Sequence, residues 1–138
     1  MPLRCRLQAG ATYRFAPESF DRIMLDPSCS ALGLRPRLLH DRTSIAELQG
    51  YAKLQRILLR WAVKLLKPGG TLVFSTCTFN PLENEANVAF ALRTFPLQLV
   101  PQGQFHLGGP GLPVRVHTIV KNARIRHVCQ YQSCMVSK

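Results

Sequence analysis

Two short apolar runs along the chain have the length and composition of buried strands. Residues 23–25 (Ile-Met-Leu) form one run, which ends at Asp26, and "TLVFST" at residues 71–76 forms the other, which ends at Cys77. An unbroken apolar run is typical of a parallel strand that is covered on both faces, whereas a half-exposed strand alternates apolar and polar positions. We therefore expect two parallel strands, each followed by a side chain that could take part in a reaction.

The segment between these runs has the apolar spacing of a long amphipathic helix. Ser44 and Glu47 form a Ser-x-x-Glu capping box at its start. The apolar positions recur at helical spacing and comprise Leu54, Leu58, Trp61 and Leu65, widened by Ile57 and Leu66. Gly50 weakens the first turns and favours a break near Tyr51. The "KPGG" at residues 67–70 then ends the helix.

A second, shorter helix is expected after the second strand. Asn80 is a good N-cap, Pro81 is a good first helical residue, and Pro96 closes the helix. Its buried stripe consists of Val88, Leu92 and Phe95. The order strand–loop–helix–strand–helix implies a right-handed crossover and a parallel sheet, so the predicted fold class is α/β.

Beyond Pro96 the pattern weakens. Residues 100–116 are rich in glycine and proline and predict a loop, while "VRVHTIV" at 114–120 has the composition of a strand. Residues 121–138 show no convincing period, so we expect an irregular C-terminal tail.

The charge of the chain is strongly positive and unevenly distributed. The net charge is +11, every acidic residue lies at or before Glu85, and six basic residues follow from Ala86 onward. Such an excess favours a polyanionic partner, most simply nucleic acid, although a solubilising surface is the alternative. No apolar run approaches the ~20 residues of a membrane span, and the N-terminus has no signal-peptide core. We expect no membrane partner.

The cysteines argue for a reducing environment. They are odd in number and irregularly spaced: Cys5, Cys29, Cys77, Cys129 and Cys134. This is not the pattern of a secreted disulfide framework, so we expect free thiols and an intracellular location, in cytoplasm or nucleus. Cys129 and Cys134, with His117 and His127 nearby, are too loosely spaced for zinc, and no metal site is expected.

Both predicted strands end in residues that could do chemistry. Asp26 and Cys29 follow the first strand, and Cys77 follows the second. Because ligands gather at the carboxyl ends of parallel strands, neighbouring strands would bring the three side chains together. A helix starting just after Cys77 would lower the pKa of its thiol, and Glu83 and Glu85 would oppose that effect, so the direction stays open. A buried, inert thiol is the alternative for each cysteine.

Two motifs give these residues a family context. "FDRIMLDPSCSALG" resembles the fourth motif of the Nop/Sun family of RNA cytosine-5 methyltransferases, and "LLKPGGTLVFSTCTFNPLENE" resembles the sixth. The resemblance covers roughly Phe15 to Leu112, and the tRNA-modifying branch looks closest. It implies a partial Rossmann-like methyltransferase sheet, the C-terminal half of the catalytic domain, within residues 1–112, followed by a basic tail at 113–138.

The resemblance also implies roles for individual residues. Cys77 would attack carbon 6 of a cytosine in tRNA or rRNA, so that carbon 5 takes a methyl group from S-adenosyl-L-methionine. Cys29 would assist release of the methylated base, and Asp26 would lie between the cofactor and the cytosine. DNA enzymes attack with the cysteine of a Pro-Cys pair in the fourth motif, where this chain has Ser28-Cys29, which favours RNA. Arg35 and Arg37 could meet phosphates or could be solvated loop charges.

The chain departs from the family pattern at three points that matter, one of which is the tail from Val114 onward, which does not match the end of the family's domain. Ala31 stands where glycine is usual, which is costly if the backbone there needs positive φ. No glycine-rich cofactor loop precedes Asp26, so we expect a truncated form that binds S-adenosyl-L-methionine weakly on its own. Two other functions stay open: a non-catalytic RNA-binding fragment or partner, and a thiol redox enzyme that uses Cys29 and Cys77.

Overall fold

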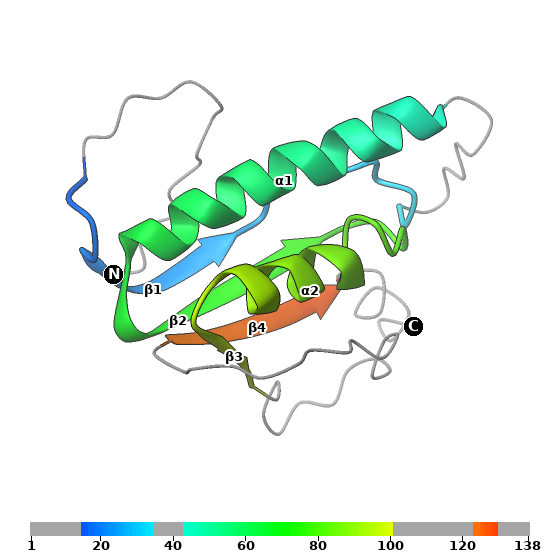
Figure 1. The fold of residues 1–138 in the computed structure, drawn as a ribbon. Coiled ribbons are helices and arrows are strands. Elements are labelled where there is room, and N and C mark those ends of the chain that lie inside the picture. Colours follow the sequence, from blue (N-terminus) through cyan, green and yellow to red (C-terminus); the bar gives the residue numbers. More distant parts are fainter. Residues whose placement is uncertain (1–14, 35–42, 101–122, 130–138) are drawn as a thin grey trace.

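A computed structural model describes residues 15–34, 43–100 and 123–129 of the 138-residue chain. The elements are β1 (Phe20–Leu25), α1 (Ile45–Leu65), β2 (Leu66–Thr76), α2 (Glu85–Thr94), β3 (Leu97–Leu99) and β4 (Ala123–Cys129). The strands form one sheet in the order β1-β2-β4-β3, and every pair is parallel (Figure 1). The predicted α/β class with a parallel sheet is confirmed. In the part of the chain that is described, neither helix combines the length and apolar character of a membrane span.

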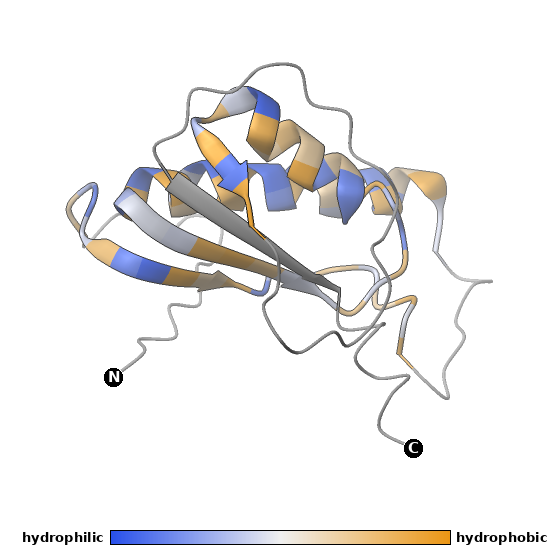
Figure 2. Ribbon diagram, turned by 90° about the horizontal axis from the view of Figure 1, so that it is seen from below, coloured by the Kyte–Doolittle hydropathy of each residue, from blue (hydrophilic) through white to orange (hydrophobic). Residues whose placement is uncertain are grey.

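The long helix α1 begins as the sequence predicts and runs without interruption. The Ser44 hydroxyl accepts a hydrogen bond from the backbone N–H of Glu47 at 3.2 Å, and the Glu47 carboxylate accepts one from the Ser44 N–H at 2.7 Å. The predicted break near Tyr51 is wrong, because the helix continues past Gly50 to Leu65. Hydrophilic and hydrophobic residues alternate along its length, as an amphipathic helix requires (Figure 2).

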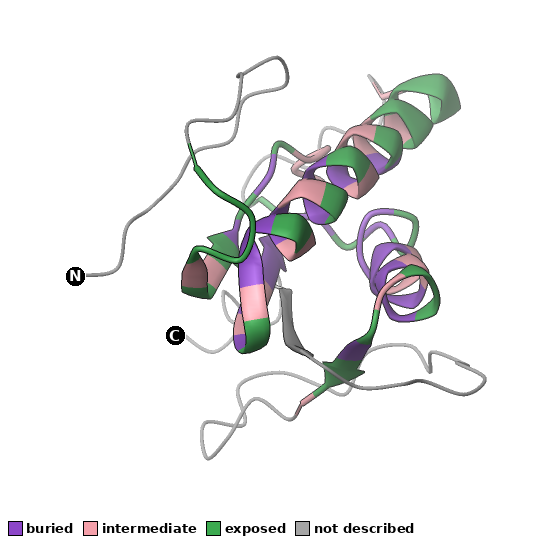
Figure 3. Ribbon diagram, turned by 60° about the vertical axis from the view of Figure 1, so that its left-hand side comes forward, coloured by how far each residue is buried: buried purple, intermediate pink, exposed green. Residues whose placement is uncertain are grey.

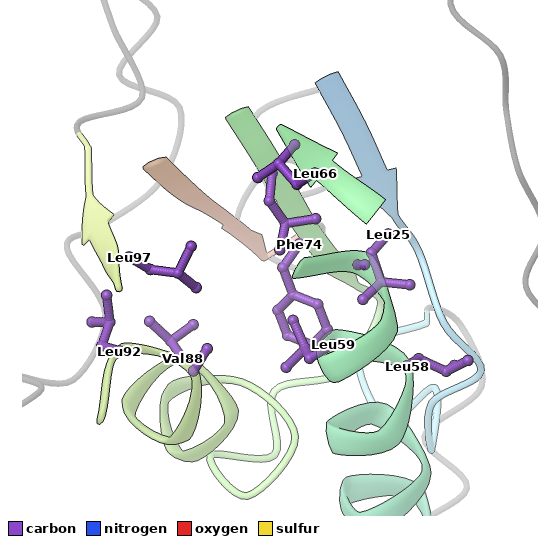
Figure 4. Packing of buried hydrophobic residues seen from close by; sticks show 11 residues of the cluster. Leu25, Leu58, Leu59, Leu66, Phe74, Val88, Leu92 and Leu97 are labelled. Carbon is purple, nitrogen blue, oxygen red and sulfur yellow. The ribbon is translucent and has the colours of Figure 1, made fainter. Parts of the chain in front are cut away.

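Both helices pack on the same face of the sheet. One apolar cluster joins residues of α1 and α2 to Leu72 and Phe74, which are fully buried and point to the same side of β2. Phe74 points toward Leu59 of α1, and Val88 and Leu92 of α2 close the other side (Figure 4). Burial of each such side chain contributes on the order of 1.5–3 kcal/mol to stability.

The opposite face of the sheet is less covered than the apolar runs predict. Met24 is 50% exposed, and Val73, its partner in the β1–β2 register, is only partly buried. The expectation that the first strand is covered on both faces is therefore wrong for the described residues. Exposed and buried residues separate by side on α1 as well, with the buried ones toward α2 and the sheet (Figure 3).

The second helix starts later than the sequence predicts. α2 begins at Glu85, with Asn84 in the N-cap position, so the assignment of Asn80 as N-cap is wrong. Asn80 instead accepts a hydrogen bond from the N–H of Leu82 at 3.1 Å and caps the turn before the helix. A local sequence signal for a cap was correct in kind, but the turn at 81–84 separates it from the helix.

The strand β4 lies in the segment for which the sequence shows no convincing period. It pairs with β2 from Thr71↔Arg124 to Thr76↔Cys129, and with β3 on its other side. The strand that the sequence suggests at 114–120 lies outside the described residues. Long-range pairing of a basic segment with β2 is not visible in local sequence patterns.

Two glycines with opposite surroundings provide a test of this packing. A methyl group at Gly70 would lie 2.9 Å from the backbone oxygen of Asp21 and from Leu66, whereas nothing lies within 4 Å of such a group at Gly50. We expect Gly70→Ala to lower the free energy of unfolding by about 1–3 kcal/mol, because the neighbouring backbone must shift. Gly50→Ala should raise it by about 1 kcal/mol, because alanine favours the helix. Denaturant unfolding of both variants measures this; destabilisation by both, or by neither, would contradict it.

Candidate active site

The two strand ends meet at one edge of the sheet and bring two thiols into contact. β1 and β2 are paired in parallel, and both point to the same edge (Figure 1). Just beyond them the sulfur of Cys29 lies 3.1 Å from the sulfur of Cys77. Both thiols are free and partly exposed, and the Gly33 N–H donates to the Cys77 carbonyl at 3.0 Å. The structure thus places the two predicted cysteines together, and their chemical roles stay predictions.

Asp26 sits at the same edge with its carboxylate exposed. Its Oδ1 accepts a hydrogen bond from the hydroxyl of Ser75 at 3.0 Å, which ties the end of β1 to β2. This contact holds the carboxylate near Cys77, whose pKa its negative charge helps to raise. The third residue of the predicted constellation is therefore present at the site.

The Cys77 thiol is held in its neutral form. Burial is the main cause that raises its pKa from 9.0 to about 12, followed by the hydrogen bond and the charge of Cys29. A backbone hydrogen bond within Cys77 acts in the opposite direction but is outweighed. The expected influence of a helix dipole does not dominate, because α2 begins at Glu85, beyond an intervening turn. The direction that the sequence left open is upward.

A fully buried carboxylate, Glu83, lies behind the thiols and accepts four hydrogen bonds. Its Oε1 accepts from the Ser30 hydroxyl at 2.5 Å and from Asn80 Nδ2 at 3.0 Å. Its Oε2 accepts from the Ser30 backbone N–H at 3.0 Å and from Gln55 Nε2 at 2.9 Å. The same Gln55 amide also donates to the Ser28 carbonyl at 3.0 Å. The Cys29 loop, the Cys77 loop and α1 therefore converge on one side chain.

The helices contribute a further polar layer to this centre. Asn87 of α2 donates to the Gln55 side-chain oxygen at 2.7 Å and to the Glu83 carbonyl at 3.1 Å. Arg56 of α1 donates to the Asn87 side-chain oxygen at 3.0 Å. Gln55 and Asn87 are fully buried, so these bonds compensate the loss of hydration.

Hydrogen bonds also fix the end of β2. The Thr76 hydroxyl donates to Asn84 Oδ1 at 2.5 Å, and Asn84 Nδ2 donates to the Thr78 carbonyl at 2.8 Å. The hydroxyls of Ser30 and Thr78 share a hydrogen bond at 2.8 Å. Cys77 lies between two fully buried threonines and is therefore held by its neighbours on both sides.

The sequence did not predict the roles of Gln55, Asn87 and the buried Glu83. Gln55 and Asn87 stand on helices and Glu83 stands in the turn before α2, where polar residues are usually solvated. The one available signal was that Gln55 is adjacent to Leu54 and is followed three and four residues later by apolar residues, at a position that faces the core. A polar residue at such a position implies a buried partner.

Ala31, in the loop that carries Cys29, has a left-handed backbone conformation. Its φ is +57°, the region that glycine adopts freely and that costs other residues roughly 1–2 kcal/mol. The backbone condition that made alanine unfavourable in the sequence is therefore met. The Leu34 N–H donates to the Ala31 carbonyl at 3.0 Å, which closes the turn.

Some predicted features cannot be placed at this site. Arg35 and Arg37 lie outside the described residues. Within residues 15–34, 43–100 and 123–129, no group of three histidine, cysteine or acidic side chains could hold a metal. The glycines of the described segments are dispersed over a loop, a helix and a strand, so no glycine-rich turn there cradles a nucleoside cofactor.

The raised pKa of Cys77 leads to an expected pH profile for alkylation. Because the thiolate is the reactive form, the rate should rise with a midpoint near pH 12, not near 9.0. The same shift stabilises the fold fully below pH 9.0, and this contribution is lost as the pH rises through about 12. Iodoacetamide labelling of the Cys77 peptide, read by mass spectrometry, measures the profile.

The Cys29→Ala variant is the matched control for that profile. It removes two of the causes that raise the Cys77 pKa and leaves burial, so the midpoint should fall but stay above 9.0. A midpoint near 9.0 in the unaltered chain would contradict the assignment.

Comparison with known proteins places this site in a family. The family model of the 16S rRNA methyltransferase RsmB/F matches residues 6–108. A mouse protein named tRNA (cytosine(72)-C(5))-methyltransferase NSUN6 is 57% identical over 99 residues, which are 71% of this chain and 20% of that protein. An Arabidopsis thaliana protein named rRNA (cytosine-C(5))-methyltransferase NOP2C is 50% identical over 106 residues, which are 76% of this chain and 18% of that protein.

An archaeal relative extends the comparison. A tRNA (cytosine(72)-C(5))-methyltransferase of Pyrococcus horikoshii is 44% identical over 92 residues, which are 67% of this chain and 23% of that protein. The chain thus spans about a fifth of the length of the curated relatives that it matches. The match includes both cysteine motifs and most of the described fold, and it confirms the resemblance seen in the sequence: this protein belongs to the RsmB/F (Nop/Sun) family of RNA cytosine-C5 methyltransferases.

Proposed function

We propose that this chain carries the base-attacking part of an RNA cytosine-5 methyltransferase. The observation that carries the proposal is the pair of thiols, Cys29 and Cys77, 3.1 Å apart at the ends of adjacent parallel strands. Asp26 lies at the same edge, where a carboxylate can accept a hydrogen bond from a base. Two thiols and a carboxylate supply a nucleophile, a second proton-transfer group and a contact for the cytosine.

The proposed chemistry uses Cys77 as the nucleophile. Its proton passes to water and its sulfur bonds to carbon 6 of the cytosine, which makes carbon 5 electron-rich enough to accept a methyl group. Water or the Cys29 thiolate then takes the carbon 5 proton, the double bond between carbons 5 and 6 is restored, and the bond between sulfur and carbon 6 breaks with its electron pair returning to Cys77. Cys29 lies beside the breaking bond and is assigned to this release step. Asp26 orients the base.

S-adenosyl-L-methionine is the proposed methyl donor, as in methyltransferases generally. When bound, it supplies an electrophilic methyl group. Asp26 is the residue that we assign to its contact, and the other assigned roles concern the cytosine.

RNA, as tRNA or rRNA, is the proposed partner, and the charge on α1 supports it. The curated relatives are named for tRNA and rRNA substrates. Arg56 and Arg60 both lie over the ring of Phe90, at 5.4 and 5.0 Å from its centroid, and Lys64 lies 5.1 Å from the centroid of Trp61. This basic ridge, defined as Arg56, Arg60 and Lys64, leads along α1 from the polar centre of the site. We expect this protein to bind its RNA substrate inside the cell, in the cytoplasm or the nucleus.

A non-catalytic RNA-binding role is the second candidate. It is favoured by the raised pKa of Cys77, which leaves little thiolate at neutral pH. It shares the basic ridge with the leading proposal and differs in requiring no covalent adduct.

Covalent trapping distinguishes these two functions. RNA that contains 5-azacytidine should form an adduct with the chain, measured by denaturing electrophoresis with and without S-adenosyl-L-methionine. Cys77→Ala should abolish the adduct, because it removes the attacking sulfur. Cys29→Ala is the control: it should still form the adduct, and with RNA that carries ordinary cytosine it should accumulate an adduct that the unaltered chain releases. An adduct that persists in Cys77→Ala would assign the nucleophile elsewhere, and no adduct in any variant would favour the non-catalytic role.

Salt-dependent binding tests the basic ridge. Arg60→Ala should weaken RNA binding at every sequence and lower the slope of log affinity against log salt by about 1, as loss of one phosphate contact does. Lys67→Ala is the control, because Lys67 already pairs with Asp21 at 3.0 Å. Fluorescence anisotropy over a salt series measures both. Equal slopes for Arg60→Ala and the unaltered chain would remove the ridge from the RNA surface.

A further inference from the structure

We propose that Glu83 is a positioning residue that sets the spacing of the two thiols. It touches neither sulfur, and it acts through the loop that carries Cys29. The importance of this spacing for cytosine chemistry rests on the proposed function, whereas the spacing itself is a property of the folded chain.

The first step of the argument is the double contact of Glu83 with the residue after Cys29. The Ser30 backbone N–H and the Ser30 hydroxyl both donate to the Glu83 carboxylate, at 3.0 and 2.5 Å. Two hydrogen bonds from one residue fix its orientation as well as its position. Cys29 is therefore held from its C-terminal side by a group that lies on the segment following Cys77.

The second step is that Gln55 connects the same carboxylate to Ser28, the residue before Cys29. Gln55 donates both to Glu83 at 2.9 Å and to the Ser28 carbonyl at 3.0 Å. Asn80, on the loop that follows Cys77, donates to Glu83 at 3.0 Å. Glu83, Ser30, Gln55 and Asn80 form what we call the carboxylate clasp. The clasp hydrogen-bonds Ser28 and Ser30, the residues on both sides of Cys29, and connects them to Asn80 on the loop that follows Cys77.

The third step is that the clasp requires a carboxylate. Each oxygen of Glu83 accepts two hydrogen bonds, and all four donors are amide or hydroxyl groups. A glutamine of the same shape would offer one accepting oxygen and would direct its NH₂ group at donors. Burial of a carboxylate is costly, and an apolar side chain could fill the same space without that cost. An apolar side chain could not accept hydrogen bonds from the four donors, whereas the Glu83 carboxylate accepts all four.

Oxidative coupling of the thiols measures their spacing directly. Cys5, Cys129 and Cys134 are first replaced by serine in the full chain, so that Cys29 and Cys77 are the remaining thiols. A diazene oxidant such as diamide then takes two hydrogen atoms from the pair, forms the S–S bond and is itself reduced to the hydrazine. The coupling rate, read as disulfide by mass spectrometry, is divided by the rate of iodoacetamide alkylation. This ratio corrects for changes in thiolate fraction and exposure.

Glu83→Gln should lower this ratio by at least ~10-fold, because a misplacement near 1 Å has effects of this order on a proximity-driven reaction. Asp21→Asn is the matched control: it also removes one carboxylate, but from an exposed pair with Lys67, and the ratio should stay within about twofold of the unaltered chain. Thermal unfolding of each variant shows whether it is folded. A folded Glu83→Gln chain with an unchanged ratio would overturn the proposal.

A milder variant keeps the test decisive if Glu83→Gln does not fold. Ser30→Ala removes the hydroxyl contact and keeps the backbone one, so the ratio should fall by about threefold. An unchanged ratio in that variant would overturn the proposal as well. The assay contains neither RNA nor a methyl donor, so a failure of adduct formation leaves this result intact, and a failure here leaves the proposed function open.

Discussion

The geometry of the candidate site depends on one buried carboxylate. Glu83 has no exposed surface, and four hydrogen bonds from three segments of the chain converge on it. Such a group is costly to bury, and it is retained only where its donors are fully arranged around it. Because those donors belong to the Cys29 loop, the Cys77 loop and α1, the carboxylate determines how strand ends and helix meet. The apolar cluster holds the sheet and the two helices together, and the hydrogen bonds around Glu83 set their alignment at the carboxyl ends of β1 and β2.

The elements specified by neighbouring residues could be predicted from the sequence. The Ser44–Glu47 capping box and the strand before Cys77 depend on local patterns, and both are present. The end of α1 was predicted only roughly: the helix ends at Leu65, and β2 begins at Leu66, so residues 67–70, which were expected to end the helix, lie in the strand. The start of α2 could not be predicted in the same way. Asn80 and Asn84 have cap-forming side chains, but tertiary contacts with Glu83 and Thr76 use them, and the helix begins beyond the expected residue.

The site was predictable in its residues and not in its support. The rule that ligands gather at strand ends predicts from the sequence that Asp26, Cys29 and Cys77 lie close together. The direction of the Cys77 pKa depended on burial and on the distance to Cys29, neither of which a sequence states. Because its pKa is raised to about 12, the Cys77 thiol is almost entirely protonated at pH 7. A resting thiol of this kind is protected from chance electrophiles, and in the proposed reaction its attack on a base would be coupled to proton loss.

The order of the strands has a consequence for how the chain acquires its fold during synthesis. β4 comes last along the chain but lies between β2 and β3, and within the described sheet β3 pairs with β4 alone. β1, α1, β2 and α2 can associate early, since each follows its partner closely in sequence. The edge strand β3 cannot be incorporated until residues 123–129 have been synthesised and have paired with β2, which makes it a late event. Until then one side of β2 is unpaired, and the nascent domain presents an open strand edge.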